Sequence, residues 1–320
     1  MESGHGFTSL PVNEDLLKHR ILHSVKSFKK EDISDEEGEG YLLVGVDSET
    51  DEIAGTAGVE SSVGWEAPFY SYHLTTIVHA SHELGVKNTV QTLSVGNNYT
   101  GCTEICTLFL RPDFRDGLNG KLLSKSRFLL MAENMERFSR LVFAEMRGVS
   151  NDEGKSPFWE WLQESFFSID FTEADYLIGI GKKDFVADLM PKLPIYVNLL
   201  SKEAQAVIGN VHDKTIPALK LLEKEGFVFR DYVDIFDAGP SVECDLQNIA
   251  SIRNSFRACV EIGEHTSTDA YLMSNTVLED FRAVAPKALY KKETQSVVIT
   301  KDVANALVVS EGDYVRMLAV

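Results

Sequence analysis

The residues with the clearest chemical potential lie in the stretch RPDFRDGLNGKLLSKSRFLL, at positions 111–130. A strand-like segment precedes this stretch, and its second half has the apolar spacing of a helix. The N–H groups and the dipole of a helix start attract anions such as phosphate. The residues that fall at or near that start, or add positive charge to it, are Arg111, Arg115, Gly117, Asn119, Gly120, Lys121, Lys125 and Arg127.

Taken alone, this stretch has two interpretations of equal weight. One is an anion site, in which basic side chains and helix N–H groups hold a pyrophosphate. The other is an ordinary helix entry, with Gly and Asn chosen for the turn and Lys and Arg facing solvent. A single glycine-rich loop does not decide between them.

One histidine, His212, lies in a segment between two predicted helices. Loops often carry catalytic groups. An unperturbed histidine, with a pKa of about 6.5, can exchange a proton at neutral pH. From the residues alone, an exposed loop histidine without a catalytic role is the simpler interpretation.

The remaining pattern predicts the elements that must position these residues. It indicates an α+β fold, with one mixed central sheet flanked by helices and a small β-rich C-terminal extension. We expect domains at residues 1–245 and 246–320. Predicted strands lie at 41–47, 53–64, 72–81, 90–97, 103–110, 140–149 and 227–237; predicted helices lie at 13–29, 120–138, 156–167, 182–190, 201–209, 215–226 and 301–309.

Composition narrows the class of protein. The 320 residues carry a formal net charge of −18, which disfavours binding to nucleic acid and to anionic membranes. No apolar run approaches the roughly 18 residues that cross a bilayer, and the N-terminus lacks the pattern of a signal peptide. The four cysteines form neither a CxxC pair nor a zinc-like cluster with histidine. We therefore expect a cytoplasmic protein without a metal site.

Two of these segments together resemble the GNAT superfamily of acyl-CoA N-acyltransferases. The sequence RDGLNG at 115–120 matches the pyrophosphate loop of that superfamily at Arg115 and Gly120, although Leu118 replaces the usual middle glycine. LEKEGF at 222–227 matches its late helix and Gly-Phe turn. Further blocks are similar to the arginine N-succinyltransferase family; they are TSLPVNE (8–14), TEICTLFL (103–110), NGKLLSKSRFL (119–129), AEMRGV (144–149), SPFW (156–159), FFSIDF (166–171), DLMPKLPIY (188–196) and EAQAVIGNVH (203–212).

This resemblance implies transfer of succinyl from succinyl-CoA to the α-amine of L-arginine, the first step of the succinyltransferase pathway of arginine catabolism. His212 matches the proton donor of the family, and Leu108 matches a CoA contact that a leucine can make only through its backbone. Arg115, Asn119 and Gly120 would hold the CoA pyrophosphate. Leu222 stands where many GNAT enzymes have a catalytic tyrosine, which favours His212. The resemblance implies succinyl-CoA as a co-substrate, no permanently bound cofactor, and an oligomer.

Several alternatives stay open at this point. The amine acceptor could instead be another one, such as ornithine, or the chain could be an inactive GNAT-fold partner subunit. Glu104, Glu145 and Asp234 are candidates to bind the substrate guanidinium, although a structural or solvated acid is the simpler interpretation of each. The family begins with an additional strand and part of a helix, whereas this chain starts just before GFTSLP; either its start was placed late or that strand is absent.

Overall fold

A computed structural model describes residues 13–33, 38–151, 155–166 and 189–320. The helix expected at 182–190 and the blocks at 8–14 and 166–171 lie wholly or mostly outside the described residues. The chain divides into two compact units that alternate along the sequence. The first unit comprises residues 1–19, 62–104 and 141–244, and the second comprises residues 20–61, 105–140 and 245–320. The domain boundary expected at residues 245 and 246 stays a prediction.

The first unit contains a mixed sheet in which the strands run in the order β6, β9, β8, β3, β4, β7. The start of β5 pairs in parallel with β6 through Thr103 and Glu104, whereas β3, β4, β7, β8 and β9 join by antiparallel pairs. The strand bounds are β3 Ser71–Ser81, β4 Val86–Gly96, β5 Thr103–Leu110, β6 Leu141–Glu145, β7 Ile195–Tyr196, β8 Val228–Val233 and β9 Pro240–Asp245.

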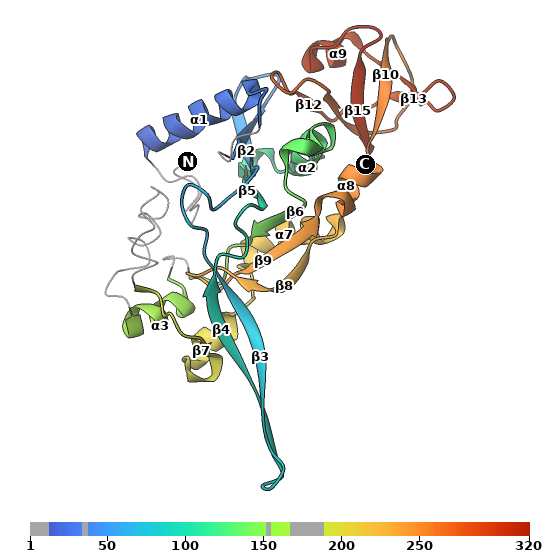
Figure 1. The fold of residues 1–320 in the computed structure, drawn as a ribbon. Helices are drawn as coiled ribbons and strands as arrows, with labels where there is room; N and C mark the ends of the chain where they lie inside the picture. The colour runs from blue at the N-terminus through green and yellow to red at the C-terminus, as the bar shows by residue number, and fades with distance from the viewer. Residues whose placement is uncertain (1–12, 34–37, 152–154, 167–188) are drawn as a thin grey trace. The chain divides into compact units, whose positions relative to one another are not determined.

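The hairpin of β3 and β4 extends beyond the sheet as a two-stranded ribbon (Figure 1). Near its base, Tyr72 and His73 pair with β8, and Thr92 and Leu93 pair with β7. Toward its tip, Thr, Val and Ile residues favour strand structure.

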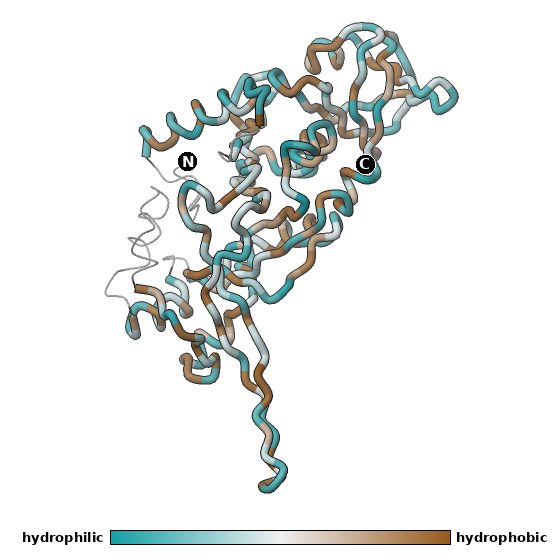
Figure 2. The backbone as a smooth tube through the Cα atoms, viewed as in Figure 1, coloured by the Kyte–Doolittle hydropathy of each residue, from teal (hydrophilic) through white to brown (hydrophobic). Residues whose placement is uncertain are grey.

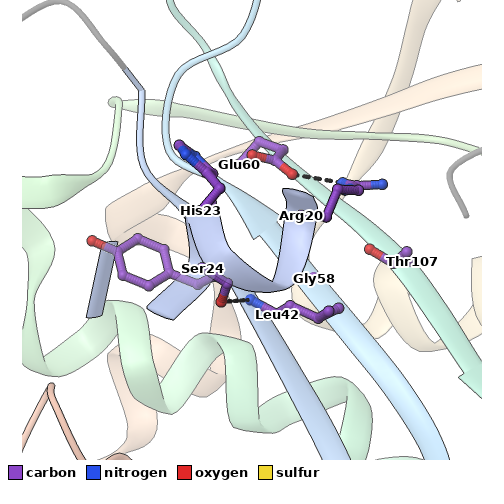
Figure 3. Close-up of a pocket in the computed structure, with 9 residues that line it drawn as sticks. Arg20, His23, Ser24, Leu42, Gly58, Glu60 and Thr107 are labelled. Carbon is purple, nitrogen blue, oxygen red and sulfur yellow. Dashed lines mark hydrogen bonds and ion pairs between the residues drawn. The ribbon is translucent and has the colours of Figure 1, made fainter. Parts of the chain in front are cut away.

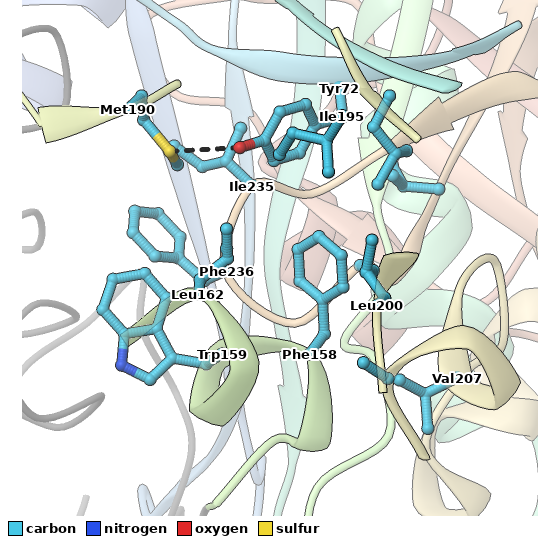
Figure 4. Close-up of a cluster of buried hydrophobic side chains, with 14 residues drawn as sticks. Tyr72, Phe158, Trp159, Leu162, Met190, Ile195, Leu200, Val207, Ile235 and Phe236 are labelled. Carbon is cyan, nitrogen blue, oxygen red and sulfur yellow. Dashed lines mark hydrogen bonds between the residues drawn. The ribbon is translucent and has the colours of Figure 1, made fainter. Parts of the chain in front are cut away.

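Helices cover one face of this sheet with an aromatic core (Figure 4). In α3 (Pro157–Phe166), Phe158 and Trp159 are fully buried, and the Trp159 ring lies 5.2 Å from that of Phe236. Ser156 accepts a hydrogen bond from the N–H of Trp159 in the first turn of α3, and Pro157 begins the helix. The other helices of the unit are α6 (Lys202–Val207), α7 (Ile216–Glu225) and the 3-10 turns η3 (Val197–Leu199) and η4 (Asp213–Thr215).

In the second unit, β1 (Gly40–Val46) pairs antiparallel with β2 (Ile53–Glu60), and the later part of β5 lies beside β2. The helix α1 (Glu14–Lys29) contacts β1 through its buried Ser24 and Ser27 and through the ring of Phe28, which lies 5.1 Å from that of Tyr41. Ser24 Oγ accepts a hydrogen bond of 2.8 Å from the N–H of Leu42. By contrast, Ile21 and Val25 are 52% and 47% exposed, and apolar and polar residues mix along this helix (Figure 2). Helical periodicity therefore predicted the helix but not its buried face.

The C-terminal part of the second unit is a separate six-stranded sheet in the order β12, β11, β15, β10, β14, β13. Its core includes Val260, Met273, Val297 and Val315. The bounds are α2 Asn119–Glu133, η2 Met135–Arg137, η5 Leu246–Asn248, α8 Ala250–Asn254, β10 Phe256–Ile262, β11 Tyr271–Asn275, β12 Ala283–Val284, β13 Leu289–Lys291, β14 Ser296–Ile299, α9 Lys301–Leu307 and β15 Tyr314–Ala319.

The predicted fold class is confirmed: a mixed sheet flanked by helices is followed by a small second sheet. Sequence reasoning missed the two-residue strand β7, the strand β9 and the short helix α8, which carry little periodic signal. Within the described part of the chain, no helix has both the length and the apolar character needed to cross a membrane.

Candidate active site

Strand β5 leads into the predicted anion loop and carries an unusual backbone angle. Thr107 has a φ of 53°, a left-handed conformation that β-branched residues rarely adopt. The carbonyl of Thr107 accepts a hydrogen bond of 3.0 Å from Thr56 Oγ1 on the neighbouring strand. The half-buried Leu108, the predicted CoA contact, follows directly. The local turn of the backbone therefore changes the direction of the strand at the residue predicted to meet the CoA arm.

The loop after β5 has the geometry of an uncapped helix start. Gly117 has a φ of 48°, so this glycine supplies the left-handed turn that the missing middle glycine would otherwise give. The helix α2 then runs from Asn119 to Glu133, against the predicted 120–138, and its N-cap residue Leu118 makes no side-chain capping bond. The side chain of Asn119 instead closes the loop, because its Nδ2 donates to the carbonyl of Phe114 at 3.1 Å. Because leucine has no acceptor for the first-turn N–H groups, this helix start suits an external anion.

The five basic residues of the loop divide into those used by the fold and those facing solvent. Arg111 bonds Glu52 Oε2 at 3.0 Å, and this hydrogen bond raises the pKa of Arg111. Arg127 is buried, donates to the Ser124 carbonyl at 3.0 Å, and has its pKa lowered to about 10 by burial. Arg115 is exposed, and its Nε donates to the Leu110 carbonyl at 2.9 Å. The guanidinium of Arg115 is therefore anchored at one end and presented to solvent at the other.

His212 lies in the first unit, half-buried, as the N-cap residue of η4. Its Nδ1 accepts a hydrogen bond of 3.1 Å from the N–H of Lys214. Since a backbone N–H can only donate, the neutral ring carries its proton on Nε2. The backbone of His212 is also held, because its N–H donates to the Arg147 carbonyl at 2.9 Å. Both the ring orientation and the protonated nitrogen of His212 are thus set by the fold.

The late helix α7 follows this loop and ends as predicted. Gly226, with a φ of 99°, closes the helix, and the N–H of Phe227 donates to the carbonyl of Leu222 at 3.1 Å. Leu222 is buried, which agrees with a packing role at the position where related acyltransferases often have a tyrosine.

The three acids considered for the guanidinium occupy different settings in the first unit. Glu104 pairs with Phe143 in the β5–β6 ladder, and Glu145 ends β6. Asp234 is used structurally, because its Oδ1 accepts hydrogen bonds from the N–H groups of Phe236 and Asp237 at 2.7 and 2.9 Å. This use gives Asp234 a structural role in the turn.

Sequence reasoning missed a buried carboxylate beside an aromatic stack. The hydroxyl of Tyr99 donates to Glu243 at 3.0 Å, and the Tyr99 ring stacks on Phe143 with centroids 4.1 Å apart. Burial, followed by the charge of Glu243, raises the pKa of Tyr99. Glu243 also pairs with Arg230 at 3.2 Å. No local signal pointed to this cluster, because Tyr99 and Glu243 are 144 positions apart.

A small pocket in the second unit lies between α1 and strands β1, β2 and β5 (Figure 3). Arg20 and Glu60 form an ion pair of 2.7 Å at its edge, and Thr107, the residue before Leu108, lines it. Among the residues that the structure describes, no group of three or more His, Cys, Asp or Glu side chains is arranged to hold a metal ion.

Comparisons with known proteins agree along nearly the whole chain. A family model described as "Arginine N-succinyltransferase beta subunit" matches residues 1–251, and one for its C-terminal domain matches residues 255–319. Arginine N-succinyltransferases of Salmonella schwarzengrund and Citrobacter koseri are each 47% identical over 319 residues, which is 99% of this chain and 92% of each relative. The arginine/ornithine succinyltransferase subunit AI from Pseudomonas aeruginosa aligns with a TM-score of 0.90 at 36% identity, covering 99% of this chain and 92% of that one.

Proposed function

The chain belongs to the arginine N-succinyltransferase family, and we propose from this that it transfers succinyl from succinyl-CoA to the α-amine of L-arginine. The products are N2-succinylarginine and CoA, and the reaction opens the succinyltransferase pathway of arginine catabolism. The observation that carries the proposal is 47% identity to arginine N-succinyltransferases over 99% of the chain. The family predicted from the sequence is confirmed by the same match.

The chemistry needs a proton at the leaving sulfur. The amine of arginine, once neutral, attacks the thioester carbonyl, so that a C–N bond forms and the carbonyl oxygen becomes an oxyanion. Collapse of this intermediate breaks the C–S bond and releases the CoA thiolate. The attacking nitrogen loses one proton as the amide forms, and the thiolate takes one up. We assign His212 Nε2 as the nitrogen through which this proton is passed, so that the ring ends the reaction neutral, as it began, and the bond that Lys214 makes to Nδ1 supports this choice of nitrogen. A positioned acid of this kind accelerates such a step by roughly 10²–10⁴-fold.

The start of α2 is the proposed clasp for the donor. Arg115, Asn119 and Gly120 would meet the CoA pyrophosphate, and the backbone of Leu108 would meet its arm. The uncapped start of α2 and the exposed guanidinium of Arg115 support this assignment. Succinyl-CoA is then a co-substrate that binds and leaves, and the reaction as written requires no permanently bound cofactor.

A thiol-release assay tests the proposal. Purified protein is mixed with succinyl-CoA or acetyl-CoA, together with arginine or ornithine. We expect the fastest CoA release with succinyl-CoA and arginine. Faster release with ornithine would favour that acceptor, an alternative that the name of the Pseudomonas aeruginosa relative supports. No release with any pair would contradict the enzyme and favour an inactive partner subunit.

We also propose that the chain self-associates through the tip of the β3–β4 hairpin. An isolated two-stranded ribbon is marginally stable in water, yet this one exposes Val78, Leu84 and Val86 at 53%, 77% and 48%. Residues 75–91 contain one Glu and one Lys, so a second copy of this chain of net charge −18 meets no charge repulsion there. Light scattering should give an oligomer for the wild type and a monomer for Leu84→Asp with Val78→Asp; a monomeric wild type would contradict the proposal.

The cysteines support a cytoplasmic location. All four, Cys102, Cys106, Cys244 and Cys259, are free of disulfides. Free cysteines are typical of proteins in a reducing compartment. We therefore propose that the chain acts in the cytoplasm, which fractionation of cells that express it would test.

A further inference from the structure

The turn between β8 and β9, residues 234–239, is built around two aspartates. Asp234 accepts the N–H groups of Phe236 and Asp237, and the N–H of Asp234 donates to the Gly239 carbonyl at 2.8 Å. Oδ1 of Asp237 accepts the N–H of Gly239 at 2.8 Å. The carboxylate of Asp234 therefore shapes the turn. That of Asp237 uses one oxygen within the turn, and its second oxygen bonds elsewhere.

That second oxygen reaches a segment about ninety positions away in the sequence. Oδ2 of Asp237 accepts the N–H of Gly148 at 2.7 Å. The approach is close: a Cβ on Gly148 would lie 2.6 Å from the Asp237 carbonyl oxygen, and a Cβ on Gly239 would lie 2.1 Å from that of Met146. Only glycine fits at these two positions, because real Cβ atoms do not come so near to backbone oxygen.

Gly148 in turn holds the loop of His212. It forms an isolated β-bridge with Val211, and the preceding residue Arg147 accepts the N–H of His212 at 2.9 Å. The other side of the loop returns to the aspartate turn, because the N–H of Gly209 donates to the carbonyl of Ala238 at 2.8 Å. The turn therefore fixes the His212 loop from both sides.

We infer that Asp237 is a positioning residue for His212, acting through Gly148 and Arg147 to fix where the Nε2 proton is delivered. This inference rests on the proposed function, in which His212 is the proton donor. A fixed backbone matters because a misplacement of about 1 Å can cost on the order of 10²-fold in rate. Asp237 itself does not need to touch either substrate.

The charge state of the turn agrees with this arrangement. Burial, followed by the neighbouring charge of Asp234, raises the pKa of Asp237. Burial also raises the pKa of Asp234, although hydrogen bonds from the backbone oppose this shift. The two carboxyl groups thus favour sharing a proton, which lets them lie side by side without mutual repulsion.

The test compares Asp237→Asn with Asp231→Asn. Both variants lose one aspartate, but Asp231 is exposed on β8. In Asp237→Asn, an amide N–H₂ would face one of the two backbone donors that the carboxylate now accepts. We expect kcat to fall about 10-fold to 100-fold, with KM for both substrates changed less than about 2-fold. The Asp231→Asn control should keep the wild-type kcat.

A double-mutant cycle separates positioning from general damage. In a His212→Ala background, Asp237→Asn should lower the residual kcat by less than about 2-fold, because the group that it positions is gone. An equal loss of kcat with and without His212 would overturn the inference, as would an unchanged kcat in the single variant. If Asp237→Asn does not fold, Asp237→Glu gives the same test, because it keeps the carboxyl group and lengthens its reach.

These outcomes stay distinct from failure of the proposed function. A wild type that releases no CoA with any donor and acceptor pair contradicts the function itself. An active wild type with a fully active Asp237→Asn variant contradicts only the positioning role.

Discussion

The start of α2 and the loop of His212 both contain functional glycines, but the first is open to solvent and the second is tightly packed. We call them the open region and the closed region. At the start of α2, Gly117 turns the chain, a Cβ there would meet no atom within 4 Å, and Arg115 is exposed. At the His212 loop, Gly148 and Gly239 leave no room for a Cβ, and both oxygens of Asp237 are bonded to the backbone. A site that binds and releases a ligand needs hydrogen-bond donors that the fold does not already use. A loop that positions a proton donor needs its own polar groups hydrogen-bonded within the protein.

The largest expected effect is a loss of kcat on substitution of His212, in the closed region. His212→Ala removes the proton donor, so kcat should fall roughly 10²–10⁴-fold. The Kd of succinyl-CoA, measured by calorimetry, should stay within about 2-fold, because the predicted donor-binding residues are elsewhere. A variant with wild-type kcat would remove His212 from the mechanism.

Next in size is a comparison of the two kinds of glycine by urea unfolding, followed by circular dichroism. Gly239→Ala places a Cβ 2.1 Å from the Met146 carbonyl, and we expect a loss of about 3 kcal/mol in the free energy of unfolding. Gly117→Ala meets no atom but keeps a left-handed φ, so about 1 kcal/mol should be lost. Equal losses of unfolding free energy would show that the loop of Gly117 is packed as tightly as the turn of Gly239.

Binding of succinyl-CoA at the open region is tested by substituting two arginines of the same loop. Arg115→Ala should raise the Kd of succinyl-CoA roughly 10-fold, because an exposed cation near a pyrophosphate is lost. Arg111→Ala changes the charge equally but removes a side chain already bonded to Glu52 and Asp113, so its Kd should rise less than about 3-fold. The reverse order would move the clasp to Arg111.

The smallest effect is a pH dependence of stability. Because burial raises the folded pKa of Asp237, its proton stabilises the folded state below the unfolded pKa of about 3.9, and this contribution is lost as pH rises above that value. Asp237→Asn cannot lose a proton. The unfolding free energy of the wild type, relative to this variant, should therefore fall by at least about 1 kcal/mol between pH 5 and pH 9. A difference that grows with pH would contradict the raised pKa.

The sequence predicted the open region well because its signals are local. Gly117 and Asn119 mark a turn and a helix start within a few residues, and β5 was predicted with its observed bounds. The strand–loop–helix order therefore needed no distant contact.

The closed region could not be predicted in the same way. Asp237 and Gly148 are 89 positions apart, and nothing in either segment indicates the other. His212 itself was identified through its resemblance to a family, since an isolated loop histidine carries little signal. The face that α1 buries could not be predicted for a related reason: apolar spacing that includes Ile21 and Val25 marks a helix, whereas burial depends on the strand that packs against it.

The central claim is that the start of α2 binds the donor and the His212 loop performs the proton transfer. Its most direct test measures both the Kd of succinyl-CoA and the single-turnover rate with saturating arginine, in wild type, Arg115→Ala and His212→Ala. We predict that Arg115→Ala raises Kd with little change in the saturated rate, and that His212→Ala lowers the rate roughly 10²–10⁴-fold with little change in Kd. The opposite pattern, or a change of both quantities in both variants, would contradict this division of roles.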